Sequence, residues 1–332
     1  MKVLIVHAHH EAQSFCSALS KRAKSTLEKQ GHEVIFSDLH AMNFDPVSDR
    51  RNFKTVKDAN YLKQQQEEMF ATESSGFAAD LEAEMKKLEE CDALIFSFPL
   101  WWFGMPAILK GWCDRVLAMG RVYGGGKFYE NGLGKSTKRA MLITTTGGGP
   151  NVYDGWGLNP AMDNLLQPIQ QGIFWFNGFL PLAPFVAWSV ARISDKEREE
   201  YLDKLAEKIE HLFEEAPIHL APMGDFPNWG PDSKNRYQVV VSRIAPIDEQ
   251  YLKLVPEEIK VVGEMKREGV LMDFQMSAND AADWKAFLKI RATDEDECRK
   301  HLARLPLAPY LKFDVTEIKP ITFSLPALQA SK

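Results

Sequence analysis

The sequence of 332 residues predicts an α/β fold, a doubly wound parallel sheet with helices on both faces, followed by a smaller α+β domain. Three observations support this fold class. Short apolar runs rich in β-branched residues alternate with amphipathic segments through the first two thirds of the chain. After Pro217 this alternation stops at a segment with three prolines, two glycines and no periodicity. Beyond it, short runs alternate apolar and polar residues, as in an antiparallel sheet that packs on one face.

The first domain, 1–218, alternates predicted strands and helices. The predicted strands are KVLIVH (2–7), HEVIFSDL (32–39), DALIFSFP (92–99), KRAMLITTT (138–146) and one within FLPLAPFVAWSV (179–190). The predicted helices are 14–30, 80–91, 106–119, one that contains IQQGIFWFNGF (169–179), and 197–217. Gly31 marks the end of the first helix, and Pro106 begins the third, where its missing N–H does no harm. A polar stretch from about Val47 to Ser75 is predicted to be a long excursion. Such alternation indicates parallel strands joined by right-handed crossovers.

The segment 219–236 is predicted to be a linker, and 237–322 a second domain. The predicted order of the second domain is strand, helix, strand, strand, helix, strand. The corresponding segments are 237–244, 257–269, 270–277, 284–292, 294–305 and 310–318. This β-α-β-β-α-β order is that of a ferredoxin-like fold.

Composition excludes several classes of protein. The formal net charge is −6 and no long Lys/Arg block is present, which argues against a nucleic-acid partner. The four cysteines form no CxxC pair, so neither a disulfide framework nor a structural zinc site is expected. No apolar run reaches the ~18 residues of a membrane span, and the N-terminus shows no cleavage site of a signal peptide. These features predict a cytoplasmic protein.

In parallel sheets, ligands bind beyond the carboxyl ends of the strands. The segments predicted to lie there are 9–15, 99–103 and 145–153. The second holds Trp101, Trp102 and Phe103, three adjacent aromatic residues that cannot all face one core. They form either a packed corner or a flat wall for a planar ligand, and their position favours the wall.

The turn after the first strand indicates which cofactor the domain binds. It reads HAHHEAQSF, without the G-x-G-x-x-G of a nicotinamide dinucleotide site, and the sequence has no P-loop. The glycines of 147–149 are followed by Pro150 and not by a helix start. Ser14 and the N–H groups at the start of the first helix could hold a phosphate without a lysine, as flavodoxin-type flavin sites do. The alternative for Ser14 is a plain helix cap.

Five motifs resemble one enzyme family. They are HAHHEAQSFCSAL, SDLHAMNFDP, FPLWWFGMPAILKGWCDRV, TTTGGGPNVY and PIQQGIFWFNGF, and they occur in order over about residues 1–220. Together they resemble the NAD(P)H:quinone oxidoreductases of the DT-diaphorase type. The resemblance implies a flavodoxin-like homodimer that binds FAD, with FMN less favoured. It also implies that NAD(P)H donates a hydride to the flavin and leaves before the quinone enters, a ping-pong reaction.

The resemblance also implies roles for individual residues. The residues that match flavin-binding positions are His9, Ser14, Phe15, Cys16, Gln64, Pro99, Leu100, Trp102, Phe103, Thr145, Thr146, Gly147, Gly148 and Tyr153. The residues that match substrate-binding positions are Trp102, Phe103, Tyr123, Asn159 and Phe176, of which Tyr123 and Phe176 would come from the second subunit. Catalytic roles fall to the amides of Gly147 and Gly148, which would stabilise negative charge on the reduced ring, and to Tyr153, which would assist hydride delivery.

The chain departs from the family pattern at several positions. Cys16 stands where the family commonly has Asn, and packing is favoured over reactivity for its thiol. Asn159 replaces a histidine found in some members and cannot act as a general acid. Gly125 replaces a second pocket tyrosine, which predicts a wider mouth for bulkier quinones. Gln171 and Trp175 stand where some relatives hold zinc through histidines, so no metal is predicted.

Other possibilities stay open at this stage. The protein could be a flavin-binding ancillary subunit of a membrane transporter, or an FMN reductase that uses free flavin. In the second domain, LPLAPYLKFDVTEIKPI (305–321) resembles the muconolactone-isomerase-like group of dimeric α+β barrels. That resemblance implies an isomerase-like or monooxygenase-like activity, or a role in dimerisation only.

Overall fold

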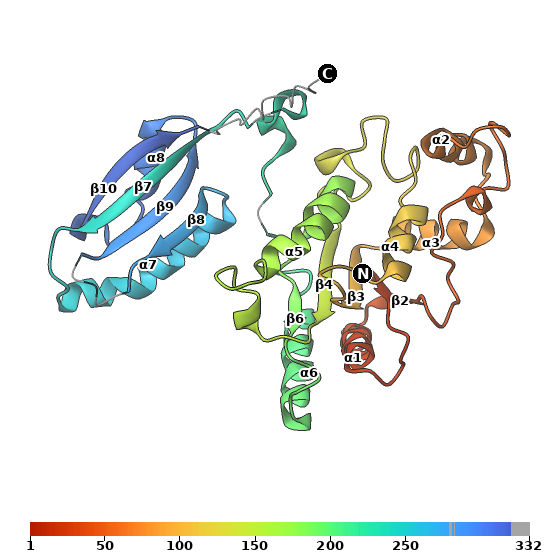
Figure 1. The fold of residues 1–332 in the computed structure, drawn as a ribbon, viewed down its shortest axis with the longest axis horizontal. Coiled ribbons are helices and arrows are strands. Elements are labelled where there is room, and N and C mark those ends of the chain that lie inside the picture. The colour runs from red at the N-terminus through yellow and green to blue at the C-terminus, as the bar shows by residue number, and fades with distance from the viewer. Residues whose placement is uncertain (219, 231, 279–280, 282, 320–332) are drawn as a thin grey trace, which may run out of the picture. The chain divides into compact units, whose positions relative to one another are not determined.

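The computed structural model describes residues 1–218, 220–230, 232–278, 281 and 283–319. The chain divides into two compact units, Met1–Ile218 and His219–Lys332, each with its own hydrophobic core (Figure 1).

The first unit is built on a parallel sheet with the strand order β2-β1-β3-β4-β5, and β6 also pairs with β4. The strands are β1 Lys2–His7, β2 Glu33–Asp38, β3 Ala93–Pro99, β4 Arg139–Thr145, β5 Leu180–Pro181 and β6 Phe185–Ala187. In this order the first strand lies inside the sheet, which is the doubly wound arrangement of flavodoxin-like folds. The predicted fold class is therefore confirmed.

Helices cover both faces of this sheet. They are α1 Phe15–Lys29, α2 Gln64–Ser74, α3 Ala79–Glu90, α4 Ala107–Val116, α5 Met162–Ile169 and α6 Asp195–Glu210. Helices α1 and α6 pack on one face over a core that includes Val3 and Ile95, whereas α3, α4 and α5 pack on the other face over Leu4 and Phe96. Because both faces are buried, the central strands are continuous apolar runs and not alternating ones.

Helix α2 lies within the stretch that the sequence predicted as an excursion. Two of its three buried residues are glutamates, Glu67 and Glu68, which explains why no apolar periodicity predicted it. The Glu67 carboxylate accepts the N–H groups of Lys57 and Asp58 at 2.8 and 2.9 Å, and Glu68 accepts the N–H of Met119 at 2.7 Å. The helix is therefore held by carboxylate–amide hydrogen bonds.

The end of the first unit also differs from the prediction. The run 179–190 forms two short strands, because Pro181 and Pro184 remove N–H donors from it. The predicted helix over 169–179 begins earlier, as α5, and continues through a π-helical turn, Gln170–Phe174, and a 3₁₀ turn, Trp175–Asn177.

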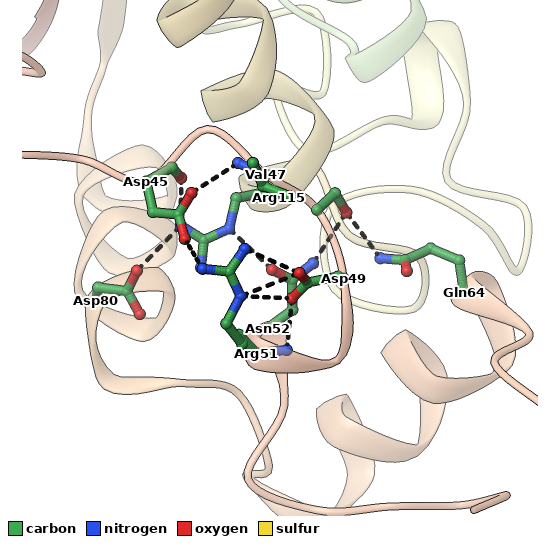
Figure 2. Close-up of polar contacts among 9 residues, drawn as sticks. Asp45, Val47, Asp49, Arg51, Asn52, Gln64, Asp80 and Arg115 are labelled. Atoms are coloured by element: carbon green, nitrogen blue, oxygen red, sulfur yellow. Dashed lines mark hydrogen bonds and ion pairs between the residues drawn. The ribbon is translucent and has the colours of Figure 1, made fainter. Parts of the chain in front are cut away.

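A buried arginine fastens the excursion to α4 (Figure 2). The Arg115 guanidinium donates to Asn52 Oδ1 at 2.8 Å and to the Asp45 carbonyl at 2.6 Å, and it pairs with Asp80 at 3.2 Å. Close backbone packing accompanies these contacts, since a Cβ added at Gly111 would lie 2.3 Å from the Pro46 carbonyl oxygen. The contacts fix the path by which the chain reaches α2.

A second set of buried polar groups lies between β1, β3 and α1. His7, at the end of β1, is 2% exposed, and its two ring nitrogens lie 3.0 Å from Ser17 Oγ and 3.2 Å from Ser97 Oγ. Burial lowers the pKa of this imidazole to about 4. His7 is therefore neutral near pH 7.

The second unit is a four-stranded antiparallel sheet in the order β10-β7-β9-β8 with helices on one face. Its elements are β7 Asn235–Arg243, α7 Glu249–Arg267, β8 Leu271–Met276, β9 Lys285–Ala292, α8 Glu295–Leu302 and β10 Leu311–Ile318. The predicted ferredoxin-like order is confirmed. Helix α7 begins before the predicted start at 257, because Asp248 caps it and the helix continues through Pro256. The last predicted residues of this domain, 320–322, lie outside the described residues.

Part of the segment predicted as a linker is bonded to the second sheet. The Arg291 guanidinium on β9 donates to Asp232 at 2.6 and 2.9 Å and to Asp225 at 2.6 Å. Asp232 also accepts from Arg236 at 2.8 Å. These charge-assisted bonds anchor the described residues around 225–236 to the second unit.

Over the described residues, no helix combines the length and the hydropathy that crossing a membrane requires.

Because the Arg115 guanidinium is buried, we expect a large loss of stability when this residue is substituted. Arg115→Leu leaves Asn52 Oδ1 and the Asp45 carbonyl without their donor, and we expect the free energy of unfolding of the first unit to fall by about 3 kcal/mol. Arg51→Leu is the matched control, because Arg51 bonds Asp45 and Asp49 in the same cluster but is exposed, so its loss should cost less than about 1 kcal/mol. Urea denaturation measures both values, and equal losses would contradict the assignment.

The lowered pKa of His7 predicts acid sensitivity. Between pH 6.5 and 4 the unfolded chain binds a proton that buried His7 does not. The stabilisation is therefore complete above pH 6.5 and is lost as the pH falls toward 4, by about 3 kcal/mol. His7→Gln cannot titrate and should remove this part of the pH dependence. His211→Gln, at an exposed position, should leave it in place; denaturation at several pH values decides the matter.

Candidate active site

Three loops meet at the carboxyl ends of β1, β3 and β4. The register pairs His7 of β1 with Ser97 of β3, and Pro99 of β3 with Thr145 of β4. The next residue, Leu100, donates its N–H to the Thr145 carbonyl at 2.9 Å. The loops that hold most of the predicted flavin-binding residues therefore share one edge of the sheet.

The aromatic loop after β3 is a tight turn with two residues in unusual backbone conformations. Trp101 and Gly104 exchange two backbone hydrogen bonds, of 3.1 and 2.9 Å, around Trp102 at φ 51° and Phe103 at φ 60°. Positive φ at both central residues defines a type I′ turn, a position that normally holds Asn or Gly. Two bulky residues there cost roughly 1–2 kcal/mol each. The turn leaves Trp102 98% exposed and Phe103 46% exposed, as a ligand wall requires.

The glycine turn after β4 presents free hydrogen-bond donors. Within the described part of the chain, the amide N–H groups of Gly147, Gly148 and Gly149 have no acceptor. A Cβ added at Gly147 would meet no atom within 4 Å. Thr146 holds the turn, because its hydroxyl donates to the Gly148 carbonyl at 2.7 Å and its N–H to the Ala187 carbonyl at 3.0 Å. The turn can therefore bind an electron-rich ligand edge directly through its backbone.

Tyr153 connects the glycine turn to the aromatic wall. Its ring centroid lies 6.3 Å from that of Phe103, edge to face, and 5.8 Å from that of Trp188. The Tyr153 carbonyl accepts the N–H of Met162 at 2.9 Å, which closes the loop between them. Half-buried Asn159 belongs to this loop.

The turn between β1 and α1 supplies a second group of donors. Ser14 caps α1 by accepting the N–H of Ser17 at 3.1 Å. The N–H groups of Phe15 and Cys16 have no backbone acceptor among the described residues, as is usual at a helix start. His9 accepts the N–H of Glu11 at 3.0 Å through Nδ1, and burial lowers its pKa.

Phe15 and Cys16 can contact a ligand in this turn only through their backbone N–H groups, because both side chains are packed against the protein. The Phe15 ring packs against Tyr201 of α6, with centroids 6.4 Å apart. Cys16 is buried, its Sγ lies 4.0 Å from Ser97 Oγ, and burial raises the pKa of the thiol to about 12. An un-ionised thiol of this kind is unreactive, in keeping with a packing role.

The other predicted residues line a separate cavity of about 410 Å³. Gln64 from α2, Tyr123 and Phe176 all border it, beside the part of α4 that includes Asp114. The rings of Tyr123 and Phe176 lie 6.0 Å apart, and Gln65 donates to the Tyr123 hydroxyl at 3.2 Å. No residue of the aromatic wall or the glycine turn is among those that line this cavity.

Burial perturbs two ionisable groups at this cavity. It raises the pKa of Glu68, and it likewise raises the pKa of Tyr123. Gln64 donates to Glu68 at 2.8 Å. It also donates to Ser48 at 3.3 Å, and Ser48 accepts from Asn52. Asn52 in turn accepts from Arg115 (Figure 2). The Gln64 side chain is therefore oriented by the same contacts that hold the excursion.

Sequence reasoning missed several side chains near these loops. The sequence predicts Trp188 as part of a strand, whereas it follows β6 at the same edge. His10 stacks on His9 with centroids 4.8 Å apart and contacts Trp101 at 5.6 Å. The sequence predicts His7 only as the end of a strand. The sequence does offer one signal for His7: it is a polar residue at the end of an apolar strand, at the carboxyl edge of the sheet.

The donor set fits a planar ligand that carries negative charge. Unpaired amides lie at the glycine turn and at the start of α1, and the exposed rings of Trp102 and Phe103 lie between these turns in the strand order. Flavin nucleotides combine a flat ring with a phosphate tail, and these residues would accept both parts. Among the described residues, no group of three or more His, Cys, Asp or Glu side chains could hold a metal ion.

Comparison with known proteins identifies the first unit. A family model described as the flavodoxin-like fold matches residues 1–212. NAD(P)H dehydrogenase [quinone] 1 of Rattus norvegicus is 39% identical over 226 residues, which are 68% of this chain and 82% of the rat protein.

A second relative and a solved structure support the same assignment of the first unit. Ribosyldihydronicotinamide dehydrogenase [quinone] of Homo sapiens is 38% identical over 218 residues, which are 65% of this chain and 94% of that protein. A solved crystal structure from Klebsiella pneumoniae matches with a TM-score of 0.66 and 36% identity, over 68% of this chain and 91% of that one. The chain belongs, through its first unit, to the flavodoxin-like family of NAD(P)H:quinone oxidoreductases.

Proposed function

We propose that the first unit binds FAD at the carboxyl edge of its sheet and reduces quinones with a hydride taken from NAD(P)H. The observation that carries this proposal is the row of three consecutive glycine amides that have no acceptor among the described residues, next to a strained turn that exposes two aromatic rings. The names of the relatives, which are NAD(P)H and ribosyldihydronicotinamide dehydrogenases of quinones, agree with it.

A bound flavin would supply the chemistry of accepting and donating a hydride. The chain's own residues would bind and orient it. The amides of Gly147, Gly148 and Gly149 would hold negative charge at the ring edge. Trp102 and Phe103 would cover the ring and keep water from it, at about 1 kcal/mol for such stacking.

The turn between β1 and α1 would hold the phosphate end. The N–H groups of Phe15 and Cys16 would donate to phosphate oxygens, helped by the partial positive charge of the start of α1. His9 belongs to the same turn. FAD is proposed in preference to FMN on the family resemblance, and mass analysis of the released cofactor distinguishes the two.

Tyr153 would act on the substrate side of the ring. It contacts Phe103 edge to face, so its hydroxyl is held near the wall where the reacting ring would stack. Asn159 would offer hydrogen bonds without titrating, and the proton on the reduced quinone would come from Tyr153 or from water. NAD(P)H and quinone would use the same face of the ring in turn, which is the ping-pong order.

The predicted residues form two separate groups, the aromatic wall and the residues of the cavity, and this separation supports a homodimer. Trp102 is almost fully exposed in the single chain, which is unusual for so large a ring outside an interface or ligand site. The cavity with Tyr123, Phe176 and Gln64 lies on a different part of the same unit. In the proposed dimer, the aromatic wall of one protomer faces this cavity of its partner and the two together enclose the substrate.

The spectrum of the purified protein tests the proposal. We expect flavin absorbance that NADPH bleaches anaerobically and that a quinone restores. A protein that is colourless and binds no added flavin would overturn it. Flavin bleached by NADPH without quinone turnover would instead indicate an ancillary role.

Gly147→Ala is a specific variant for the same test. The added methyl meets no protein atom, so the free energy of unfolding should change by less than about 0.5 kcal/mol. It would lie where the ring edge binds, so we expect flavin affinity to fall by about tenfold or more. Gly224→Ala in the second unit, equally open, is the control. Unchanged affinity in Gly147→Ala would exclude this turn as the ring site.

The glycines after Tyr123 predict a preference for bulky quinones. Gly125 has φ 61° and nothing within 4 Å of an added Cβ, so the mouth of the substrate site would be open there. We expect substituted naphthoquinones to be turned over with a higher kcat/KM than benzoquinone. Gly125→Tyr should reverse this ratio, whereas Gly125→Asn, which tolerates positive φ, should keep it. A parent enzyme without preference for larger rings would contradict the prediction.

A further inference from the structure

The hydrogen bonds around His7 determine where each of their hydrogens lies. The Ser17 hydroxyl donates its single hydrogen to the Glu11 carbonyl at 2.9 Å. Its oxygen must then accept from its other two neighbours, His7 Nε2 at 3.0 Å and the Ser14 hydroxyl at 3.0 Å. His7 therefore carries its hydrogen on Nε2, and its Nδ1 accepts from the Ser97 hydroxyl at 3.2 Å.

This assignment limits what Ser14 can do in the free protein. Its hydroxyl hydrogen is given to Ser17, and its oxygen accepts the N–H of Ser17 as the helix cap. In that state Ser14 has no hydrogen to donate to a phosphate at the start of α1. The hydroxyl must first turn away from Ser17.

His7 makes that rotation inexpensive. When the Ser14 hydroxyl leaves, Ser17 Oγ still accepts from His7 Nε2 and still donates to the Glu11 carbonyl, so the buried oxygen keeps a donor. Without His7, the same rotation would leave the Ser17 oxygen with no donor in a site that is 2% exposed. The imidazole is held neutral by burial, so it contributes a hydrogen bond to Ser17 and not a positive charge.

We propose that His7 is a positioning residue for phosphate binding: it holds Ser17 so that the Ser14 hydroxyl is free to turn toward the phosphate of a bound flavin. The proposal rests on the flavin site proposed above and acts through two serines, since His7 itself touches no ligand. If His7 had only a structural role, its substitution would lower the affinity for all flavins alike. If His7 is a positioning residue, its substitution lowers the affinity only for flavins that carry a phosphate.

Two substitutions separate the two hydrogen bonds of His7. The amide nitrogen of Gln in His7→Gln occupies about the place of Nε2 and keeps a donor to Ser17. The shorter amide of His7→Asn reaches only the place of Nδ1, so it keeps the contact with Ser97 and loses that with Ser17. Both remove the imidazole from the same buried position, so each controls for the other.

The measurement is the affinity of the flavin-free full chain for FAD, FMN and riboflavin, from quenching of flavin fluorescence. For His7→Asn we expect the ratio of FMN to riboflavin affinity to fall by about tenfold, the value of one hydrogen bond to a charged group. For His7→Gln it should stay within about twofold of the parent. An equal loss for all three flavins, or the same ratio in both variants, would overturn the proposal.

A second pair of variants keeps the test independent of the folding of His7→Asn. Ser17→Ala removes the oxygen that holds the Ser14 hydroxyl in the free protein, so the Ser14 hydroxyl has no bond to leave and the same ratio should rise. Ser20→Ala removes an equally buried hydroxyl of α1 that donates only to the Ser17 carbonyl, at 2.9 Å, and should leave the ratio unchanged. If the parent chain binds no flavin, the proposed function fails and takes this proposal with it. If the parent binds flavin and the ratio falls or does not change in Ser17→Ala, only the role of His7 fails.

Discussion

The register of β1, β3 and β4 is the constraint on which the candidate site depends. Because His7 pairs with Ser97, and Pro99 with Thr145, the loops that follow these strands leave the sheet at the same edge. Hydrophobic burial on both faces sets this register, since a slip by one residue would turn every side chain to the opposite face. The donors of the glycine turn, the aromatic wall and the start of α1 are brought together only as a consequence of that packing.

Two kinds of cost accompany this arrangement. Trp102 and Phe103 adopt backbone conformations that their side chains disfavour, and they place large apolar rings in water. Several backbone amides next to them have no partner within the described chain. Both features are unfavourable for an isolated fold, and both become favourable when a flat, electron-rich ligand covers the rings and accepts from the amides. The backbone strain at Trp102 and Phe103 and the missing acceptors of the amides are therefore both expected of a site for one flat, electron-rich ligand.

Buried polar groups give the site its rigidity. Arg115 holds the excursion on α4, and through Asn52 and Ser48 it connects to Gln64. His7 and Ser97 play a similar role beneath the turn between β1 and α1. Such groups are costly to bury without hydrogen-bond partners, so the bonds that they make favour one arrangement of the loops above them. In the second unit, Arg291 does the same for the segment that precedes β7.

The sequence by itself determined most strands and helices and the edge of the sheet where the candidate site lies, because continuous apolar runs and helix stops are local signals of burial. It also identified Trp102, Phe103 and the glycines of 147–149 as the unusual residues of that edge. It did not reveal α2, whose buried face is made of glutamates, or the two-part strand interrupted by Pro181 and Pro184. Only the tertiary structure showed that Gln64 lines one cavity with Tyr123 and Phe176, and only it brought His7 within hydrogen-bond distance of Ser17. These relations depend on which distant segments pack together, and no local pattern of side chains encodes that.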